Sequence, residues 1–301
     1  MHKIKMFPIF LLSIFFIGNL NAQDNDVVIT IDTLSNDMYM LTGQGGNIGI
    51  YVGNDHVFMI DDQFEHLSNK IKTAIRSLTD KPIAFLFNTH FHGDHTGGNA
   101  TINSTDIHVV AHDNVRKRLV QNQIKAVNEK KMTANVALKI LPEVTFSDDI
   151  TFYDRSETIM AFHVHNAHTD GDAMVYFLEN NVLHMGDTYF AGRYPYIDLD
   201  SGGSVDGFIK AQKKALTVIN EDTKIVPGHG RPSTKKELES SIAMLEEIKD
   251  IILKEIEAGR SLEDIQANTK LTEKYDTSHG ANFIKPERMK EIFYTSLKTS
   301  D

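Results

Sequence analysis

The chain has 301 residues, of which 41% are hydrophobic and 24% charged, and its formal net charge is −10. This composition is typical of a globular protein that can bury a sizeable core in one large domain or two small ones. The absence of cysteine excludes disulfide bonds, thiolate nucleophiles and thiolate metal ligands. Any bound metal ion would be held by imidazole and carboxylate groups, which suit zinc and also iron, manganese or nickel.

The first 22 residues, MHKIKMFPIFLLSIFFIGNLNA, have the three-part layout of a secretory signal peptide. Lys3 and Lys5 precede an apolar run from Met6 to Ile17, and a polar tail ends at Ala22. The apolar run is shorter than the ~20 residues that span a bilayer. We therefore predict an exported protein, periplasmic or secreted, that is cleaved near Ala22 and keeps no stable membrane anchor. The less favoured alternative is that this run forms an apolar first strand of the fold.

Cleavage would remove two lysines and change the net charge from −10 to −12. Such a charge repels phosphate backbones and anionic membranes, and no basic, aromatic-rich stretch opposes it. We therefore expect a small-molecule substrate and no nucleic-acid partner. The oligomeric state is left open.

Short strand patterns separated by turn formers follow the polar linker at residues 23–27. They are VVITIDTL, MYMLTG, IGIYVG and HVFMID. Apolar residues at helical spacing then predict an amphipathic helix over 65–79, and the run IAFLFN predicts a buried strand. IHVVAH reads as a further strand, and residues 113–139 are expected to be mostly helical.

A second series of strand patterns comprises VTF, ITFY, TIMAFHVH, AMVYFL and VLHMGD. A helix capped by Ser204 follows, then a last strand in KIVPGHG. Thr234 and Glu237 fit a capping box that opens a long helix ending before Gly259, and shorter helices are expected at 261–267 and 286–298. Two strand-rich halves, each followed by helices, predict two sheets packed face to face with helices outside.

The stretch NTHFHGDHTGGN places His90, His92, Asp94 and His95 within six residues, directly after a predicted strand. One residue separates His90 from His92, so in an extended backbone both side chains can point to the same side. Gly93 is expected to allow a tight turn that aims the next two side chains elsewhere. The pattern therefore offers two ligands to one metal ion and two to a neighbouring ion.

Three further candidate ligands stand at strand ends, where distant segments of a chain can converge. His168 lies in NAHTDGD, Asp187 in HMGDTYF and His229 in VPGHGRP. Gly228 and Gly230 flank the last histidine and would let the backbone come close. The four short patterns in this order predict a dinuclear metal site.

This set of motifs resembles the metallo-β-lactamase superfamily over roughly residues 28–232. The resemblance implies a four-layer αββα sandwich, here with extra C-terminal helices. We expect a hydrolase domain at 23–232 and helices at 233–301 packed on the same domain. The resemblance also implies two zinc ions per chain, one bound by His90, His92 and His168 and the other by Asp94, His95 and His229, with Asp187 bridging.

Such a site would use a metal-bridging hydroxide to cleave an ester, thioester, lactone or β-lactam amide, with Asp94 and Asp187 as catalytic residues. Asp61 matches the superfamily's early aspartate, and it either supports the histidine loop or caps a helix. The best-known β-lactamases of the superfamily mostly have cysteine at the position of Asp187 and lysine at that of Phe190. A bridging aspartate instead resembles glyoxalase II-like thioesterases, although no C-terminal glutathione-binding pattern is evident.

The loop from Thr188 to Phe208 is expected to border the pocket. Tyr189, Arg193 and Tyr194 are candidate substrate-binding residues, together with Tyr196, and Arg193 is the cation able to pair with a substrate carboxylate. The tyrosines could instead only pack the loop.

Two alternatives remain open at this point, a phosphodiesterase or nuclease of the same superfamily and a non-catalytic zinc-binding protein. Seven ligands disfavour the second, because a structural zinc ion is filled by four. A flavodiiron-like redox site would need an appended flavin domain, for which no residues remain.

Overall fold

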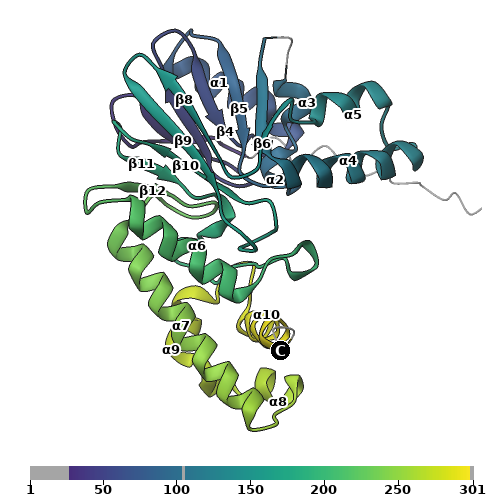
Figure 1. The fold of residues 1–301 in the computed structure, drawn as a ribbon, viewed down its shortest axis with the longest axis vertical. Helices are drawn as coiled ribbons and strands as arrows, with labels where there is room; N and C mark the ends of the chain where they lie inside the picture. Colours follow the sequence, from purple (N-terminus) through teal and green to yellow (C-terminus); the bar gives the residue numbers. More distant parts are fainter. Residues whose placement is uncertain (1–26, 104–105, 299–301) are drawn as a thin grey trace, which may run out of the picture.

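The computed structural model describes residues 27–103 and 106–298. The predicted signal peptide at 1–22 lies outside these ranges. Within them the strands form two sheets that pack face to face, with helices on the outer side of each (Figure 1). The predicted αββα sandwich is confirmed.

The first sheet has the strand order β1-β2-β3-β4-β5-β6-β7. Neighbours are antiparallel from β1 to β4 and parallel from β4 to β7. Its strands are β1 (Thr30–Thr33), β2 (Met38–Thr42), β3 (Ile48–Val52), β4 (Val57–Ile60), β5 (Ile83–Asn88), β6 (His108–His112) and β7 (Val144–Phe146).

The second sheet has the order β13-β12-β11-β10-β9-β8 and is antiparallel except between β11 and β12. Its strands are β8 (Asp149–Asp154), β9 (Glu157–His163), β10 (Ala173–Phe177), β11 (Val182–His184), β12 (Lys224–Val226) and β13 (Ser233–Thr234).

The β4 strand shows why the sheets stack between helical layers. Side chains alternate between the two faces of a strand. Phe58 and Ile60 join the apolar cluster between the sheets, whereas Val57 and Met59 join the cluster beneath α1 (Ser68–Leu78). Because both faces are covered, the strand reads as a continuous apolar run.

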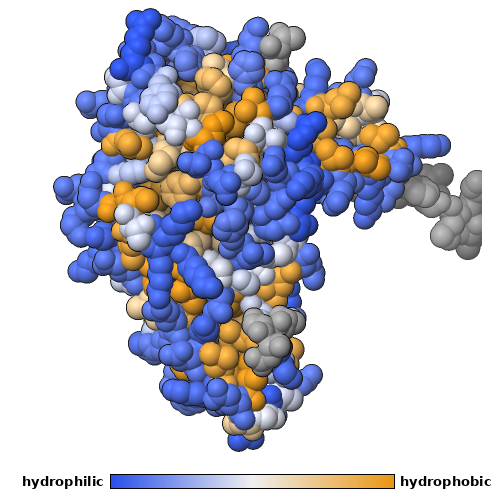
Figure 2. Space-filling view, viewed as in Figure 1, coloured by the Kyte–Doolittle hydropathy of each residue, from blue (hydrophilic) through white to orange (hydrophobic). Residues whose placement is uncertain are grey.

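Helices of the first half are α1, the short turns η1 (Glu65–Leu67), α2 (Gly93–Thr96) and α3 (Asn99–Ile102), and the arm formed by α4 (Asp113–Asn128) and α5 (Ala134–Ile140). The expected single helical stretch at 113–139 is interrupted between α4 and α5, where Lys130 has a φ of 58°. Figure 2 shows apolar side chains over this arm, where Ile124 and Leu138 are 57% and 67% exposed. Val115 and Leu119 of the arm are buried, whereas these outer apolar side chains are not covered by the rest of the described chain.

The outer layer on the second sheet begins with α6 (Val205–Val218) and α7 (Lys235–Glu257), whose predicted Ser204 cap and Thr234–Glu237 capping box are both present. Next come α8 (Leu262–Ala267), η4 (Thr269–Leu271), α9 (Glu273–His279) and α10 (Pro286–Lys298). The α8 and α10 helices match the predicted ranges, whereas α9 was not predicted. The α10 helix contacts α6, α7 and α8, so the C-terminal segment packs on the layer beside the second sheet (Figure 1). Within the described ranges, no helix combines the length and apolar character that crossing a membrane requires.

Candidate metal centre

The seven predicted ligands meet at one edge of the sandwich, although they come from both sheets. His90 and His92 follow β5 of the first sheet, and Asp94 and His95 lie in α2. The remaining three come from the second sheet: His168 from the β9–β10 loop, Asp187 from the turn η2 (Gly186–Thr188) after β11, and His229 after β12.

The α2 helix explains why the histidine motif faces two directions. His92 is its N-cap, with extended backbone, and the chain turns helical at Gly93. A Cβ atom at Gly93 would meet nothing within 4 Å, and the position is not left-handed. The chain therefore turns at Gly93 and redirects Asp94 and His95 as expected, but the turn does not use the conformational freedom of glycine.

Gly228, in contrast, is required by close approach. A Cβ atom there would lie 2.0 Å from Oδ1 of Asp187. Gly46 plays the same part beside His95, where a Cβ would lie 2.1 Å from the ring. Side chains at these positions would displace the candidate ligands.

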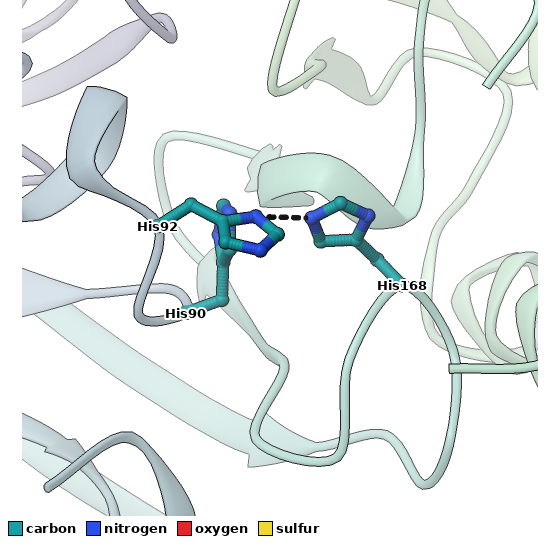
Figure 3. A group of neighbouring side chains, drawn as sticks. All are labelled: His90, His92 and His168. Carbon is teal, nitrogen blue, oxygen red and sulfur yellow. Dashed lines mark hydrogen bonds between the residues drawn. The ribbon is translucent and has the colours of Figure 1, made fainter. Parts of the chain in front are cut away.

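Three overlapping groups of side chains have potential ligand atoms within 4.8 Å of one another. They are His90–His92–His168, His90–His95–Asp187 and Asp94–His95–His229. In the first group Nδ1 of His92 lies 2.9 Å from Nε2 of His168, and Figure 3 shows these rings converging with that of His90.

Asp187 lies between the other members, and each of its oxygens faces a different set. Oδ2 is 3.8 Å from Nε2 of His90 and 3.6 Å from Nε2 of His168. Oδ1 is 3.0 Å from Nε2 of His95 and 3.5 Å from Nε2 of His229. A carboxylate in this position can contact two ions at once.

Hydrogen bonds determine which nitrogen each histidine turns toward the centre. Nδ1 of His95 donates to Asp61 at 2.7 Å, and Nδ1 of His168 donates to the Tyr196 carbonyl at 2.8 Å. Nε2 of His92 donates to Asp198 at 2.9 Å. With a proton on each of these nitrogens, the other nitrogen of each ring is the one that can bind a metal ion. Burial opposes protonation of His95, but the carboxylates of Asp187, Asp61 and Asp94 raise its pKa well above the ordinary value, so a metal ion would replace a proton there.

His90 is oriented through a relay. The Thr89 hydroxyl donates to Asp61 at 2.7 Å and can therefore accept from Nδ1 of His90, 3.1 Å away. Asp61 thus supports two candidate ligands, one directly and one through Thr89. The 3₁₀ turn that follows is preceded by Phe64, so Asp61 does not cap it. Of the two expected roles, support of the histidine loop is the one observed.

These residues fit a metal centre on the chemistry of their donor atoms. Nε2 of His90, Nε2 of His95 and Oδ1 of Asp187 are buried and have no hydrogen-bond partner within the described residues. Unsatisfied polar atoms are costly in a protein interior, and metal coordination would remove that cost.

The electrostatics of the centre also suit cations. Burial lowers the pKa of His168 to about 4, which keeps this imidazole neutral, as a ligand must be. Burial opposes protonation of His229 as well, but the neighbouring carboxylate of Asp187 raises its pKa to about 9. The negative charge that favours a proton at His229 equally favours a divalent ion.

A cavity of about 670 Å³ opens beside this centre. Four of the candidate ligands line it, namely His92, Asp94, Asp187 and His229. The remaining lining residues are mostly aromatic or apolar and include Phe64, Phe190, Arg193, Tyr194, Tyr196, Phe283 and Ile284.

The predicted substrate-binding residues occupy different positions. Arg193 lies in the lining, half-buried, and makes no hydrogen bond or ion pair with any residue that the structure describes. Tyr194 presents its ring, but its hydroxyl donates to Asp276 at 2.7 Å. Tyr189 lies outside this lining, buried, with its hydroxyl 2.8 Å from that of Ser233. Its position fits packing of the loop and not contact with a substrate.

Three contributors to the site were not predicted. Asp198 fixes His92 across 106 residues of sequence. Phe190 stacks on the ring of His229 at 5.4 Å, and Phe283 reaches the cavity from the C-terminal segment. An isolated residue has no spacing pattern, so the only available signal for Asp198 was its place in the loop expected to border the pocket.

Comparison with known proteins adds independent findings. A family described as the metallo-beta-lactamase superfamily matches residues 41–229. The solved structure of the DIM-1 metallo-beta-lactamase aligns with 17% identity and a TM-score of 0.59, covering 73% of this chain and 99% of that one. A metallo-beta-lactamase from Pontibacter korlensis aligns with 17% identity and a TM-score of 0.59, covering 72% and 99%.

A third similar structure is the stereoselective inverting sec-alkylsulfatase Pisa1 from Pseudomonas sp., with 15% identity and a TM-score of 0.71. The alignment covers 89% of this chain but only 50% of the alkylsulfatase. At these identities the likeness concerns the fold.

Proposed function

We propose a function from one established premise, which is that the chain belongs to the metallo-β-lactamase superfamily. The protein is a dinuclear zinc hydrolase that cleaves a carbonyl substrate, namely an ester, thioester, lactone or β-lactam amide. The observation that carries this proposal is the set of three overlapping ligand groups beside a large cavity, which four of their members line.

Seven candidate ligands exceed what one zinc ion can use. His90, His92 and His168 would hold one ion, and Asp94, His95 and His229 the other. Asp187 would bridge them, which agrees with its two oxygens facing different histidine pairs.

Bound in these positions, two divalent ions would polarise a carbonyl oxygen and lower the pKa of a water molecule. Asp94 is suited to proton transfer because its side chain is 29% exposed, against 6% for Asp187, and lines the cavity. Burial opposes its ionisation, but His95 and His229 hold the pKa of Asp94 below its ordinary value. Asp94 is therefore ionised at neutral pH, which is the form in which a carboxylate would accept a proton from water and later give it to a leaving group.

Arg193 would hold an acidic group of the substrate. It is the one lysine or arginine in the described lining, and its guanidinium offers donors in a geometry that matches a carboxylate. Because Arg193 makes no hydrogen bond or ion pair with any described residue, its guanidinium donors remain available to a ligand.

A sulfate ester is a second candidate substrate. The alkylsulfatase alignment covers 89% of the chain, against 73% for the DIM-1 enzyme, so its likeness in fold extends over more of the chain. A phosphodiester is less favoured because the mature net charge is negative and Arg193 is isolated. We also propose that the enzyme acts outside the cytoplasm, which rests on the sequence of residues 1–22.

The test is a substrate panel for the zinc-loaded chain beginning at Gln23, with zinc content measured by atomic emission. The panel contains a chromogenic cephalosporin, a 4-nitrophenyl ester, a thioester, a lactone, a secondary alkyl sulfate and bis(4-nitrophenyl) phosphate. We expect two zinc ions per chain and turnover of at least one carbonyl substrate that disappears in His168→Ala. Equal turnover in that variant, or turnover of the phosphodiester alone, would contradict the proposal.

A further inference from the structure

The segment between α9 and α10 forms part of the cavity wall, although it contributes no candidate ligand. Asn282, Phe283 and Ile284 all line the cavity. Ile284 is 4% exposed and packs in the core beneath the second sheet, whereas Phe283 is 85% exposed. The backbone is thus anchored beside a side chain that remains open to solvent.

Contacts on both sides of Phe283 fix the position of this segment. The Tyr194 amide donates to the His279 carbonyl at 3.1 Å, and the Tyr194 hydroxyl donates to Asp276 of α9. On the other side, Lys285 donates to the Ala281 carbonyl at 2.9 Å. The ring of Phe283 participates in none of these bonds, so its removal leaves them intact.

Phe283 continues an aromatic surface that begins at the metal centre. Its ring lies 6.3 Å from that of Tyr196 in an edge-to-face arrangement, and the Tyr196 ring lies 5.8 Å from that of His168. Phe64, Phe190 and Tyr194 line the same cavity. Covering an exposed phenylalanine is favourable because it removes apolar surface from water.

We propose that this segment selects the substrate, and that the preferred substrate carries an apolar chain or ring that packs on Phe283 and Tyr196. The inference rests on the proposed hydrolase function and adds the class of group beside the scissile bond. The C-terminal segment therefore provides specificity, while residues up to His229 provide the chemistry.

The kinetic test compares 4-nitrophenyl acetate, butyrate and octanoate with the zinc-loaded enzyme. Phe283→Ala is the test variant, and Tyr153→Ala is the matched control because Tyr153 is 80% exposed on β8 and lies outside the cavity lining. We expect kcat/KM to rise about tenfold from acetate to octanoate. Phe283→Ala should remove most of that rise, with less than about a twofold change for acetate.

A second variant, Phe283→Leu, should retain most of the preference because it keeps an apolar side chain. An equal loss on all three esters in Phe283→Ala, or an unchanged chain-length preference, would overturn the proposal. The proposal would also fail if light scattering showed a dimer that Phe283→Ala converts to monomers without altering this preference.

Calorimetric titration with decanoate and acetate separates this inference from the hydrolase function, since neither compound is a substrate. Both carboxylates can contact the metal ions, so the ratio of their dissociation constants measures how much the apolar lining at Phe283 and Tyr196 adds to binding. We expect decanoate to bind at least about tenfold more tightly than acetate to the unaltered protein, with the difference largely lost in Phe283→Ala. If none of the carbonyl substrates in the panel is hydrolysed, the hydrolase proposal fails, while the two affinities still test whether Phe283 contributes to binding of an apolar chain. Equal affinities would overturn the inference.

Discussion

At the scale of single residues, the centre depends on one buried carboxylate that is not itself a candidate ligand. Asp61 is fully buried, has a φ of 59°, and accepts hydrogen bonds from His95, from the Thr89 hydroxyl and from the Thr89 amide. Its left-handed backbone directs the side chain toward the histidine loop. The orientation of two ligands therefore depends on this position.

Asp61→Asn should weaken metal binding by about 10- to 100-fold, because an amide can present only one accepting oxygen to these donors. The measurement is competition for zinc with a chromophoric chelator. Asp55→Asn is a suitable control, since Asp55 is 68% exposed and pairs with Arg155 far from the centre. Unchanged zinc affinity in Asp61→Asn would show that the histidines hold their orientation without it.

A stacked pair of histidines joins the two sheets and makes stability depend on pH. The rings of His112 on β6 and His163 on β9 lie 3.8 Å apart at an angle of 8°. Burial, and then the charge of His112, lower the pKa of His163 to about 4. The unfolded chain, with an ordinary pKa near 6.5, binds this proton more tightly.

Stability from His163 is therefore fully present above pH 6.5 and is lost as the pH falls toward 4. Between pH 6.5 and 4, we expect the unaltered protein to lose up to about 3 kcal/mol more of its free energy of unfolding than the His163→Gln variant does. The variant should therefore give a flatter plot of melting temperature against pH. Identical slopes in the His163 variant and the unaltered protein would refute the assignment.

At the scale of elements, α4 connects two ligand-bearing loops. Arg118 donates two hydrogen bonds to Asp170, at 2.6 and 2.8 Å, close to His168 in sequence. Its guanidinium carbon also lies 5.2 Å from the ring centre of Phe91, between His90 and His92. One side chain therefore holds loops that belong to different sheets.

Arg118→Lys should release zinc to a chelator several-fold faster than the unaltered protein, because lysine keeps the charge but loses the paired hydrogen bonds. Arg118→Gln should behave similarly. Lys117→Gln, on the same helix, serves as the control because the Lys117 ammonium donates to Asn114 and to neither ligand-bearing loop. Release rates that follow charge alone would contradict this account.

The start of α7 offers a test of local stability. Thr234→Ala removes the hydroxyl that accepts from the Glu237 amide and should cost about 1 kcal/mol in the free energy of unfolding. Denaturant titration measures this loss. Lys236→Ala, at an exposed position in the first turn of the same helix, should change stability little, and an equal loss in both variants would argue against the cap.

Helix bounds and ligand motifs are the features that the sequence could predict. Capping residues and apolar periodicity are local, so α6, α7, α8 and α10 were predicted close to their observed bounds. Ligand motifs at strand ends were equally accessible, because topology brings those ends to one edge. The break between α4 and α5 is local, at the left-handed Lys130, but no glycine or proline marks it in the sequence. The roles of Asp198, Arg118 and Phe283 depend on contacts between distant residues, which leave no periodic trace.

At the scale of the whole molecule, the candidate ligands come from both sheets, so metal ions would connect the two halves of the sandwich. A ligand that binds only the folded state stabilises it by about 2.7 kcal/mol at a concentration 100 times its dissociation constant. Removal of zinc with a chelator should therefore lower the melting temperature, and restoring zinc should recover it. The variant His168→Ala should show a smaller response, whereas an equal response would place the stabilising ions elsewhere.

The C-terminal segment reaches the cavity without providing a candidate ligand from any residue described after His229. Substitutions there can alter which molecules are accepted while the catalytic apparatus stays intact. This separation gives the scaffold a route to new substrates by small inherited steps, each of which preserves a working enzyme.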